Sequence, residues 1–155
     1  MDAQLINPFL KSTIQIFSQM FELHAEPGEL YQENRLKNHR WEISGIISIL
    51  GNHFGLVVIR FPRHLSNKLL QKSGLRYKNE AEREQLVNEM VGEITNIISG
   101  NALGELADKG YDVGISPPVV VQGRNHRLDW PVDVPIIGLP FITESGPFVV
   151  NIGMS

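Results

Sequence analysis

Two polar side chains three residues apart, Glu93 and Asn96, form the pair in this sequence best suited to act on another molecule. They lie in a segment whose apolar residues recur at helical spacing, so both side chains project from neighbouring turns of one helix face. A carboxylate supplies a charged contact for docking. A carboxamide offers both a hydrogen-bond donor and an acceptor while it stays uncharged. The spacing thus places a charged group and an uncharged hydrogen-bonding group side by side, where both could contact another molecule.

The same face of this helix carries further residues that could contact a partner. Glu89 and Gly100 continue the stripe at spacings of three or four residues, and Gln85 and Gly92 flank it. The glycines leave the stripe low, so the backbone of another protein could approach closely. Taken alone, polar residues on one side of an amphipathic helix are typical of any solvated helix face.

Other patterns that indicate chemistry are weaker. The five histidines show no metal-ligand spacing, so we expect no metal site. The sequence has no nucleophile-elbow motif around a serine and no glycine-rich phosphate loop. Asp129 and Asp133 could pair as acid and base, but aspartates beside prolines are typical of a turn. The absence of cysteine excludes a thiolate nucleophile and is typical of a reducing compartment.

The composition is that of one ordinary soluble domain spanning residues 1–155, with 42% apolar and 20% charged residues. A net charge of −3 disfavours nucleic acid as a partner. We interpret the short basic run of Arg35, Lys37, His39 and Arg40 as a solvated loop. The first residues lack the basic region of a signal peptide, and no apolar stretch is long enough to span a bilayer. The sequence therefore indicates a cytoplasmic protein without a membrane partner.

The first half of the chain predicts a helix followed by a β-hairpin. Apolar residues recur at helical spacing over about residues 5–24, with Asn7 as N-cap and Pro8 at the first helical position. Two β-rich runs, 41–50 and 53–61, flank Gly51-Asn52, which predicts a hairpin with a two-residue turn. A short helix is expected over about residues 65–72.

The second half repeats this order. A long helix is expected over about residues 80–109, with acids in its first turns and Gly110 as its stop. Its core side is predicted to consist of Leu86, Val87, Met90, Val91, Ile94, Ile97 and Ile98. Strands are expected over 113–122, 135–143 and 148–152, with a turn at 144–147. The order favours an α+β fold in which two long helices pack on a largely antiparallel sheet, in two pseudo-repeated helix–hairpin halves.

The run from Val87 to Ala102 resembles the signature helix of the CheX branch of the CheC/CheX/FliY phosphatases. The E-x-x-N core is short, but Gly92 before the acid and Ile-Ile-Ser-Gly-Asn-Ala after the amide make the likeness much more specific. The segments 6–9 and 115–121 also resemble this family. The likeness covers most of the chain in order.

This resemblance implies a phosphatase that acts on the response regulator CheY, whose own aspartate carries the phosphoryl group and whose own site holds Mg²⁺. It implies that Glu93 pairs with a lysine of the regulator and that Asn96 orients the attacking water. Related members have Asp or Ser where this chain has Glu89, so the role of Glu89 stays open. The resemblance further implies a homodimer made by joining sheets, and no cofactor of its own.

The chemistry is consistent with these roles. An aspartyl phosphate is already reactive, and the regulator supplies the metal. The phosphatase therefore has only to place water in line with phosphorus. An uncharged carboxamide suits this task, whereas a second carboxylate would be repelled by the phosphoryl group.

Two alternatives remain at this point. The chain could be a non-catalytic adaptor that binds a regulator or a flagellar-switch component through the same helix. It could also be a structural dimer whose second chain covers the Glu93–Asn96 stripe. The first helix adds a further expectation: Ser12, Ile16 and Gln19 repeat the spacing of Glu89, Glu93 and Asn96, which predicts a vacant copy of the site.

Overall fold

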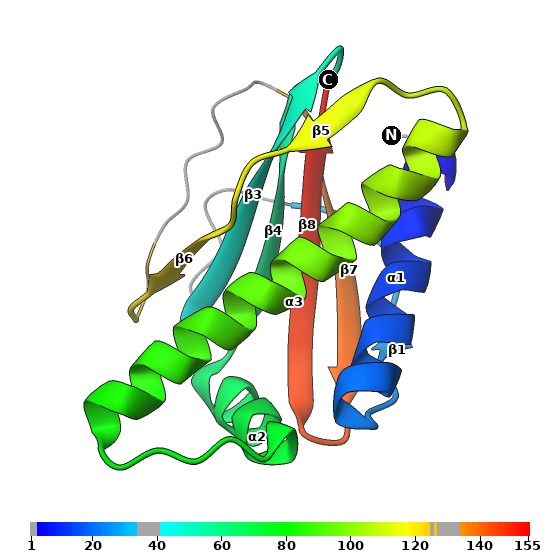
Figure 1. Cartoon of the computed structure of the whole chain (residues 1–155). Helices are drawn as coiled ribbons and strands as arrows, with labels where there is room; N and C mark the ends of the chain where they lie inside the picture. Colours follow the sequence, from blue (N-terminus) through cyan, green and yellow to red (C-terminus); the bar gives the residue numbers. More distant parts are fainter. Residues whose placement is uncertain (1–2, 34–40, 125, 127–133) are drawn as a thin grey trace.

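A computed structural model describes residues 3–33, 41–124, 126 and 134–155. Within these residues, three helices cover one face of an eight-stranded antiparallel sheet (Figure 1). The helices are α1 Ala3–Phe21, α2 Arg63–Ser73 and α3 Glu80–Asp108. The strands are β1 Glu26–Pro27, β2 Tyr31–Gln32, β3 Ile43–Gly51, β4 Gly55–Phe61, β5 Val113–Ile115, β6 Val119–Gln122, β7 Ile136–Thr143 and β8 Gly146–Met154. The predicted α+β class is confirmed.

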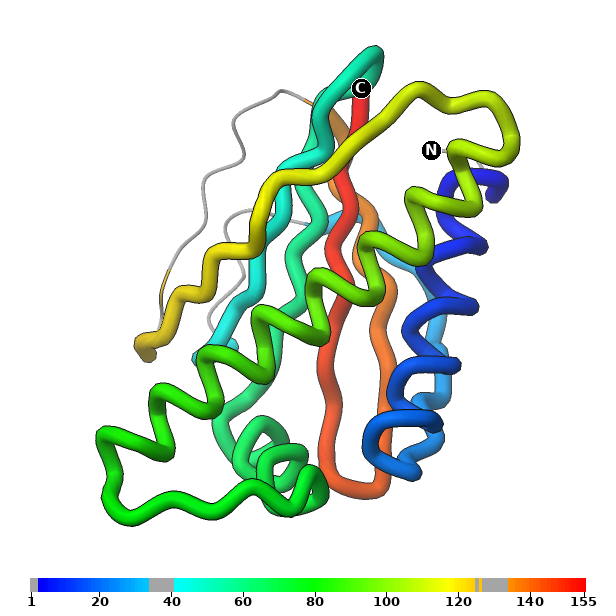
Figure 2. Tube along the Cα trace, viewed as in Figure 1, coloured from blue at the N-terminus to red at the C-terminus, as the bar shows by residue number. Residues whose placement is uncertain are grey.

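The sheet joins the two halves of the chain symmetrically. Its order is β1-β7-β8-β4-β3-β5, with β2 also paired to β7 and β6 also paired to β3. The β3–β4 and β7–β8 hairpins meet at the central β4–β8 pair, as the trace in Figure 2 shows. The short strands after each long helix pair with the hairpin of the other half. The two helix–hairpin halves are thus interlocked in one sheet.

The core lies between the helices and the sheet. Phe17 of α1 stacks on Phe148 of β8 with ring centroids 4.4 Å apart, and Phe141 of β7 also stacks on Phe148, at 5.0 Å. On α3, the predicted core residues Val87, Met90, Val91, Ile94 and Ile98 are buried, while Leu86 and Ile97 are half-buried against the same core. Burial of this face holds α3 on the sheet.

The first helix begins earlier than predicted. It starts at Ala3, so Asn7 is not its N-cap and Pro8 lies inside the helix rather than at its first position. Ile6 and Phe9, on either side of the proline, are 5% and 0% exposed. Their burial against the core holds the turn around Pro8 helical despite the missing N–H of the proline.

The first hairpin is confirmed, but its two-residue turn is wrong. The last β3–β4 pair is Ile49 with Gly55. Leu50 and Gly51 pair instead with Gly114 and with Val113 of β5. Gly51 has φ +115°, a conformation that favours glycine. Pairing with β5 on the edge opposite β4 thus extends β3 to Gly51, two residues beyond its last pair with β4, and the connection to β4 is longer than two residues.

The single strand predicted over 113–122 is also wrong. It divides into β5 and β6 around Pro117 and Pro118, which lack the N–H that a continuous ladder needs. Both pieces still pair with β3, at Ile49–Ile115 and Ile46–Val119. The divided strand carries one residue more than β3 between these two pairs, so it bulges there.

The last hairpin agrees with prediction in its strands and differs in its turn. Thr143 pairs with Gly146, so the turn consists of Glu144 and Ser145, and β8 is longer than predicted. The two-residue strands β1 and β2 were not predicted because they have no local alternation and form by pairing with β7.

Three predicted features lie outside the described residues: the basic run within 35–40, and Asp129 and Asp133. No helix among the described residues is long and apolar enough to cross a membrane.

Candidate active site

The helix α3 is fixed in place at both its start and its middle. Asn79 Oδ1 accepts a hydrogen bond from the Glu82 N–H at 2.9 Å and caps the first turn. In the middle, α3 lies directly on Gly45 of β3, where a Cβ atom would stand 2.0 Å from Thr95 Oγ1 and 3.2 Å from Val91 Cγ1. This close approach also brings the neighbouring face of α3, which carries Gly92, next to strand β6.

An open groove of about 560 Å³ runs between α3 and β6. Its two walls are formed by Asn88, Glu89, Gly92, Glu93 and Asn96 from α3, and by Pro118 and Val120 from the chain that forms β6. Val120 pairs with Gly45 and so shares the helix-facing side of the sheet. The groove is thus a product of two segments that approach the same point of β3.

The side chains of Glu93 and Asn96 are exposed on the rim of this groove. Neither forms a hydrogen bond or ion pair with any residue that the structure describes. Both groups are therefore available to another molecule.

The groove is rich in hydrogen-bond acceptors. Glu89 and Glu93 contribute carboxylates one turn apart, and Glu89 Oε1 accepts a long hydrogen bond of 3.5 Å from Gln85 Nε2. Among its described lining residues there is no lysine, arginine or histidine. The described part of the chain also contains no group of three His, Asp or Glu side chains that could hold a metal ion. The groove can therefore dock a cationic side chain.

Residues 43–142, which include both walls of the groove, match the model of the family described as chemotaxis phosphatase CheX. The chain belongs to the CheX family. This match confirms the resemblance carried by the run from Val87 to Ala102.

Three relatives illustrate the likeness. The chain is 31% identical to the chemotaxis protein CheX of Vibrio vulnificus. The match covers 99% of this chain and 100% of that chain, with a TM-score of 0.85. It is 22% identical over 130 residues to the CheY-P phosphatase CheX of Thermotoga maritima, covering 83% of this chain and 81% of that protein. It shares the fold of the CheX–CheY–BeF₃–Mg²⁺ complex of Borrelia burgdorferi, with 24% identity, 97% coverage of each chain and a TM-score of 0.82.

Four of the five predicted site residues of this CheX-family chain are brought together. Glu89, Gly92, Glu93 and Asn96 line the groove, while Gly100 lies beyond it and has no atom within 4 Å of its Cβ position. Gly92 is buried, unlike the exposed Glu89, Glu93 and Asn96. Its Cβ position is 3.6 Å from Val120 Cγ2, so Gly92 forms the floor of the groove. The partner-binding roles of these residues stay predictions.

Sequence reasoning missed the second wall and one residue of the first. Asn88 could have been predicted from the sequence, because Asn88, Gly92 and Asn96 recur every four residues and so share one helix face. Pro118 and Val120 gave no such signal, because they reach the groove only through the pairing of β6 with β3.

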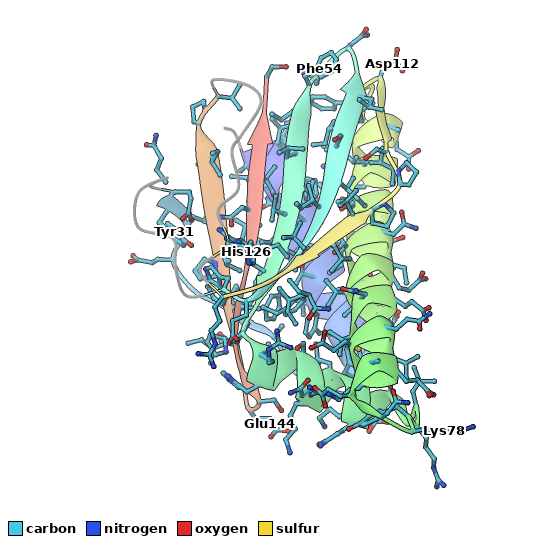
Figure 3. All side chains as sticks on the ribbon, turned by 90° about the vertical axis from the view of Figure 1, so that its left-hand side faces the viewer. Tyr31, Phe54, Lys78, Asp112, His126 and Glu144 are labelled. Atoms are coloured by element: carbon cyan, nitrogen blue, oxygen red, sulfur yellow. The ribbon has the colours of Figure 1, made fainter. Side chains whose placement is uncertain are left out.

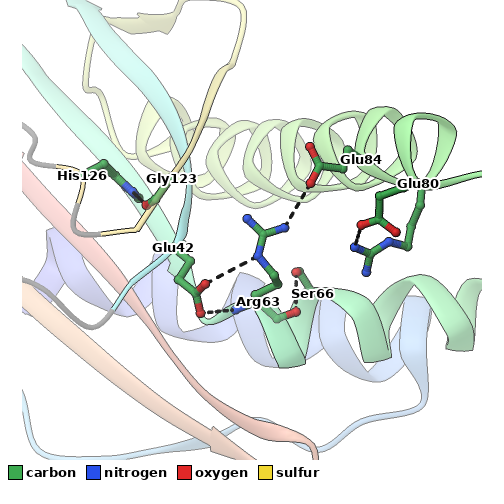
Figure 4. A network of polar contacts seen from close by, with 8 residues as sticks. Glu42, Arg63, Ser66, Glu80, Glu84, Gly123 and His126 are labelled. Atoms are coloured by element: carbon green, nitrogen blue, oxygen red, sulfur yellow. Dashed lines mark hydrogen bonds and ion pairs between the residues drawn. The ribbon is translucent and has the colours of Figure 1, made fainter.

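A polar network joins the two walls of the CheX-family groove at one end (Figure 4). Glu42, just before β3, accepts a hydrogen bond at 3.3 Å from the N–H of Arg63, whose Nε also lies 3.5 Å from the carboxylate. Arg63 Nη1 reaches Glu84 of α3 at 3.4 Å. The Glu42 carbonyl accepts from the N–H of Gly123, just after β6. These partly exposed contacts stabilise the fold only slightly, but they fix α3 and β6 relative to one strand.

The predicted vacant copy on α1 faces the interior. Ser12 and Ile16 are buried, and Ser12 Oγ donates a hydrogen bond at 3.2 Å to the Ile98 carbonyl of α3. Gln19 is exposed. Because α1 packs against α3 along this stripe, two of its three positions are closed to a partner.

The sheet face away from the helices carries a different polar cluster. Arg60 is 3% exposed and donates to Ser44 Oγ at 3.2 Å, and Ser44 is 2.7 Å from His126 Nε2. Nearby, burial and Glu33 raise the pKa of Tyr31 to about 12. Tyr31 and His126 both lie on the side of the sheet away from α3 (Figure 3). This cluster is thus separated from the groove by the sheet.

Proposed function

We propose that this chain is a phosphatase that hydrolyses the aspartyl phosphate of a CheY-type response regulator. One observation carries the proposal: Glu93 and Asn96, the acid–amide pair of the CheX-family helix, stand exposed and without described partners on the rim of an open groove. The names of two relatives support it, since one is a CheY-P phosphatase and another was solved with CheY, BeF₃ and Mg²⁺.

Asn96 acts by orienting water. The oxygen of a water molecule attacks phosphorus, the bond between phosphorus and the aspartate oxygen breaks, and free aspartate and inorganic phosphate result. The carboxamide oxygen of Asn96 accepts a hydrogen bond from this water and holds it in line, while the amide stays uncharged beside the phosphoryl group. The Mg²⁺ that offsets the phosphoryl charge belongs to the regulator, so this chain needs no cofactor of its own.

Glu93 acts by docking. Its carboxylate pairs with a lysine of the regulator's active site and fixes the register of Asn96, which lies one turn further along α3. Glu89 adds a second carboxylate to the same wall, and Gly92 and Gly100 keep the helix surface low around the pair. Complementary charge of this kind contributes chiefly to specificity and to the rate of association.

We further propose that residues 1–155 act as one domain, in the cytoplasm, and as a homodimer formed by joining sheet edges. The absence of cysteine supports a reducing compartment. The outermost strands β1, β2, β5 and β6 are only two to four residues long, and among the described residues no strand pairs with their outer edges, so a second chain could pair there.

Replacing Asn96 by alanine tests the catalytic role. Because Asn96 is exposed and unpaired, the free energy of unfolding should change by no more than about 0.5 kcal/mol. Turnover of saturating phosphorylated regulator should fall by roughly a hundredfold or more, since alignment of water is lost. Asn96→Asp should not restore it. Affinity for a regulator that carries a stable phosphoryl mimic should survive in Asn96→Ala.

Replacing Glu93 by alanine tests the docking role, and its effects should differ from those of Asn96→Ala. This change should weaken binding as well as turnover, by about 2–5 kcal/mol if the charge pair is buried on docking. If Asn96→Ala keeps wild-type turnover at saturation, Asn96 is not catalytic. If the wild-type protein binds the regulator without accelerating phosphoryl loss, the protein is an adaptor.

A further inference from the structure

A second carboxamide lies in the groove, at the end away from Asn96. Asn88 of α3 is exposed, and its Oδ1 accepts a hydrogen bond at 2.6 Å from Nε2 of Gln122, the last residue of β6. The bond connects the two walls of the groove. The other polar atom of Gln122, Oε1, is buried without a partner. This pair is not part of the network around Glu42.

The bond to Gln122 determines which end of Asn88 remains for another molecule. Oδ1 is occupied, so the Nδ2 group is left with its two N–H donors, and it has no partner among the described residues. The reverse orientation would add an oxygen to a groove that the carboxylates of Glu89 and Glu93 already line. Repulsion between these acceptors favours the orientation in which Asn88 presents its donors.

We propose that Asn88 is a specificity-determining residue that donates a hydrogen bond from Nδ2 to a main-chain carbonyl of the response regulator. This inference rests on the proposed function. A cationic side chain entering the groove would be bound by Glu89 or Glu93, so the donors of Asn88 are left for an acceptor. A main-chain carbonyl is an acceptor without a charge that those carboxylates would repel.

The spacing along α3 locates this carbonyl. Asn88 and Glu93 are five residues apart, which is about 7.5 Å along a helix axis. The two positions also differ by about 140° around the axis, so their side chains diverge. Because both line the same groove, the carbonyl belongs to a part of the regulator that docks beside the lysine paired with Glu93. Asn88 is about 12 Å along the axis from Asn96, so it acts on docking and not on the attack of water.

The hydrogen bond from Gln122 prepares Asn88 for its contact with the regulator. Asn88 is held in one rotamer before the regulator arrives, so less side-chain freedom is lost on docking. The contact should therefore appear in KM and in the affinity for the regulator, while kcat stays the same.

The variant Asn88→Asp isolates the donor. It keeps the size of the side chain and an oxygen that can accept from Gln122 Nε2, and it replaces only the N–H donors. With a CheY-type regulator phosphorylated by a small phosphodonor, KM should rise about tenfold, the effect of one lost interface hydrogen bond, with kcat within about twofold. Asn101→Asp is the matched control. Asn101 is exposed on α3 outside the groove, so the same change in charge there should alter KM and kcat by less than about twofold.

A second variant, Gln122→Leu, separates this role from a structural one. It removes the bond to Asn88 together with the buried, unpartnered Oε1. The melting temperature should therefore stay the same or rise, while KM should rise about threefold because Asn88 is no longer held. A structural role would instead lower the melting temperature and leave KM unchanged.

An unchanged KM in Asn88→Asp would overturn the inference, and so would a fall in kcat alone. A lower KM would also overturn it, because the regulator would then present a cation at this point. Asn96→Ala in the same assay separates the two proposals. If Asn96→Ala loses turnover while Asn88→Asp is neutral, the inference alone fails. If Asn96→Ala keeps turnover while Asn88→Asp raises KM, the catalytic role of Asn96 alone fails.

Discussion

Replacing Gly45 by alanine should move α3 away from the sheet and thereby disturb the groove from beneath. Gly45 lies in β3, and a Cβ atom there would stand 2.0 Å from Thr95 Oγ1 and 3.1 Å from Thr95 Cβ. Thr95 is fully buried and is the residue between Ile94 and Asn96. Since non-bonded heavy atoms in contact are about 3.5 Å apart, helix and strand would have to separate by about 1 Å or more.

Two opposing effects decide how much Gly45→Ala changes the free energy of unfolding. Gly45 has no positive φ, so its backbone accepts alanine, and restricting the unfolded chain would by itself stabilise the fold by about 0.4–1 kcal/mol. Forcing an extra methyl group into a packed core costs about 1–3 kcal/mol. The overlap here is with a buried hydroxyl that already donates to the Val91 carbonyl, so the cost is at the upper end. We expect a net loss of about 2 kcal/mol and a turnover about a hundredfold lower, as for a misplacement of about 1 Å.

Denaturant unfolding and the turnover assay measure the two effects. Gly114→Ala is the matched control, because Gly114 is a strand glycine on the same sheet with no atom within 4 Å of its Cβ position. It should be neutral or slightly stabilising. The double variant Gly45→Ala/Thr95→Ala removes the closest overlap, so its loss should be smaller than the sum of the single losses by about 1 kcal/mol. Wild-type stability in Gly45→Ala, or additivity in the double variant, would refute the view that Gly45 sets the height of α3.

Two further predictions concern the far face and the edges of the sheet. Partial burial and the neighbouring Glu33 raise the pKa of Tyr31 from 10.0 to about 12, which favours the protonated phenol in the folded state. The stability that this provides is therefore complete below pH 10 and is lost between pH 10 and 12. Tyr31→Phe should remove that loss in unfolding measurements and should abolish the late step in the tyrosinate absorbance. Light scattering at micromolar concentration should show a dimer, and a monomer there would contradict the proposed joining of sheet edges.

The acid–amide pair was predictable because a helix face is a local property. The apolar residues of α3 recur with the helical period, and their burial against the sheet requires that Glu93 and Asn96 face outward. The hairpins were predictable for a similar reason, since turn residues and apolar runs are adjacent in the sequence. The family likeness used the same local run of residues, from Val87 to Ala102.

The predictions failed where a distant segment or an interrupted pairing decided the local structure. The two-residue turn at Gly51-Asn52 was wrong because β5 pairs with the end of β3, and the strand over 113–122 divides where two prolines interrupt its pairing. Likewise, the stripe of Ser12 and Ile16 on α1 could not be distinguished from a surface, because α3 covers it.

The sequence by itself determined that α3 forms, which of its faces is apolar, and that Glu93 and Asn96 share a stripe on the other face. Only the tertiary structure decided that this stripe is one wall of a groove. The opposite wall, with Pro118 and Val120, is more than twenty residues away in sequence and reaches the site because β6 pairs with β3. The bulge before β6 and the missing side chain of Gly45 set the separation of the two walls. Both are contacts between distant segments, for which a local pattern carries no signal.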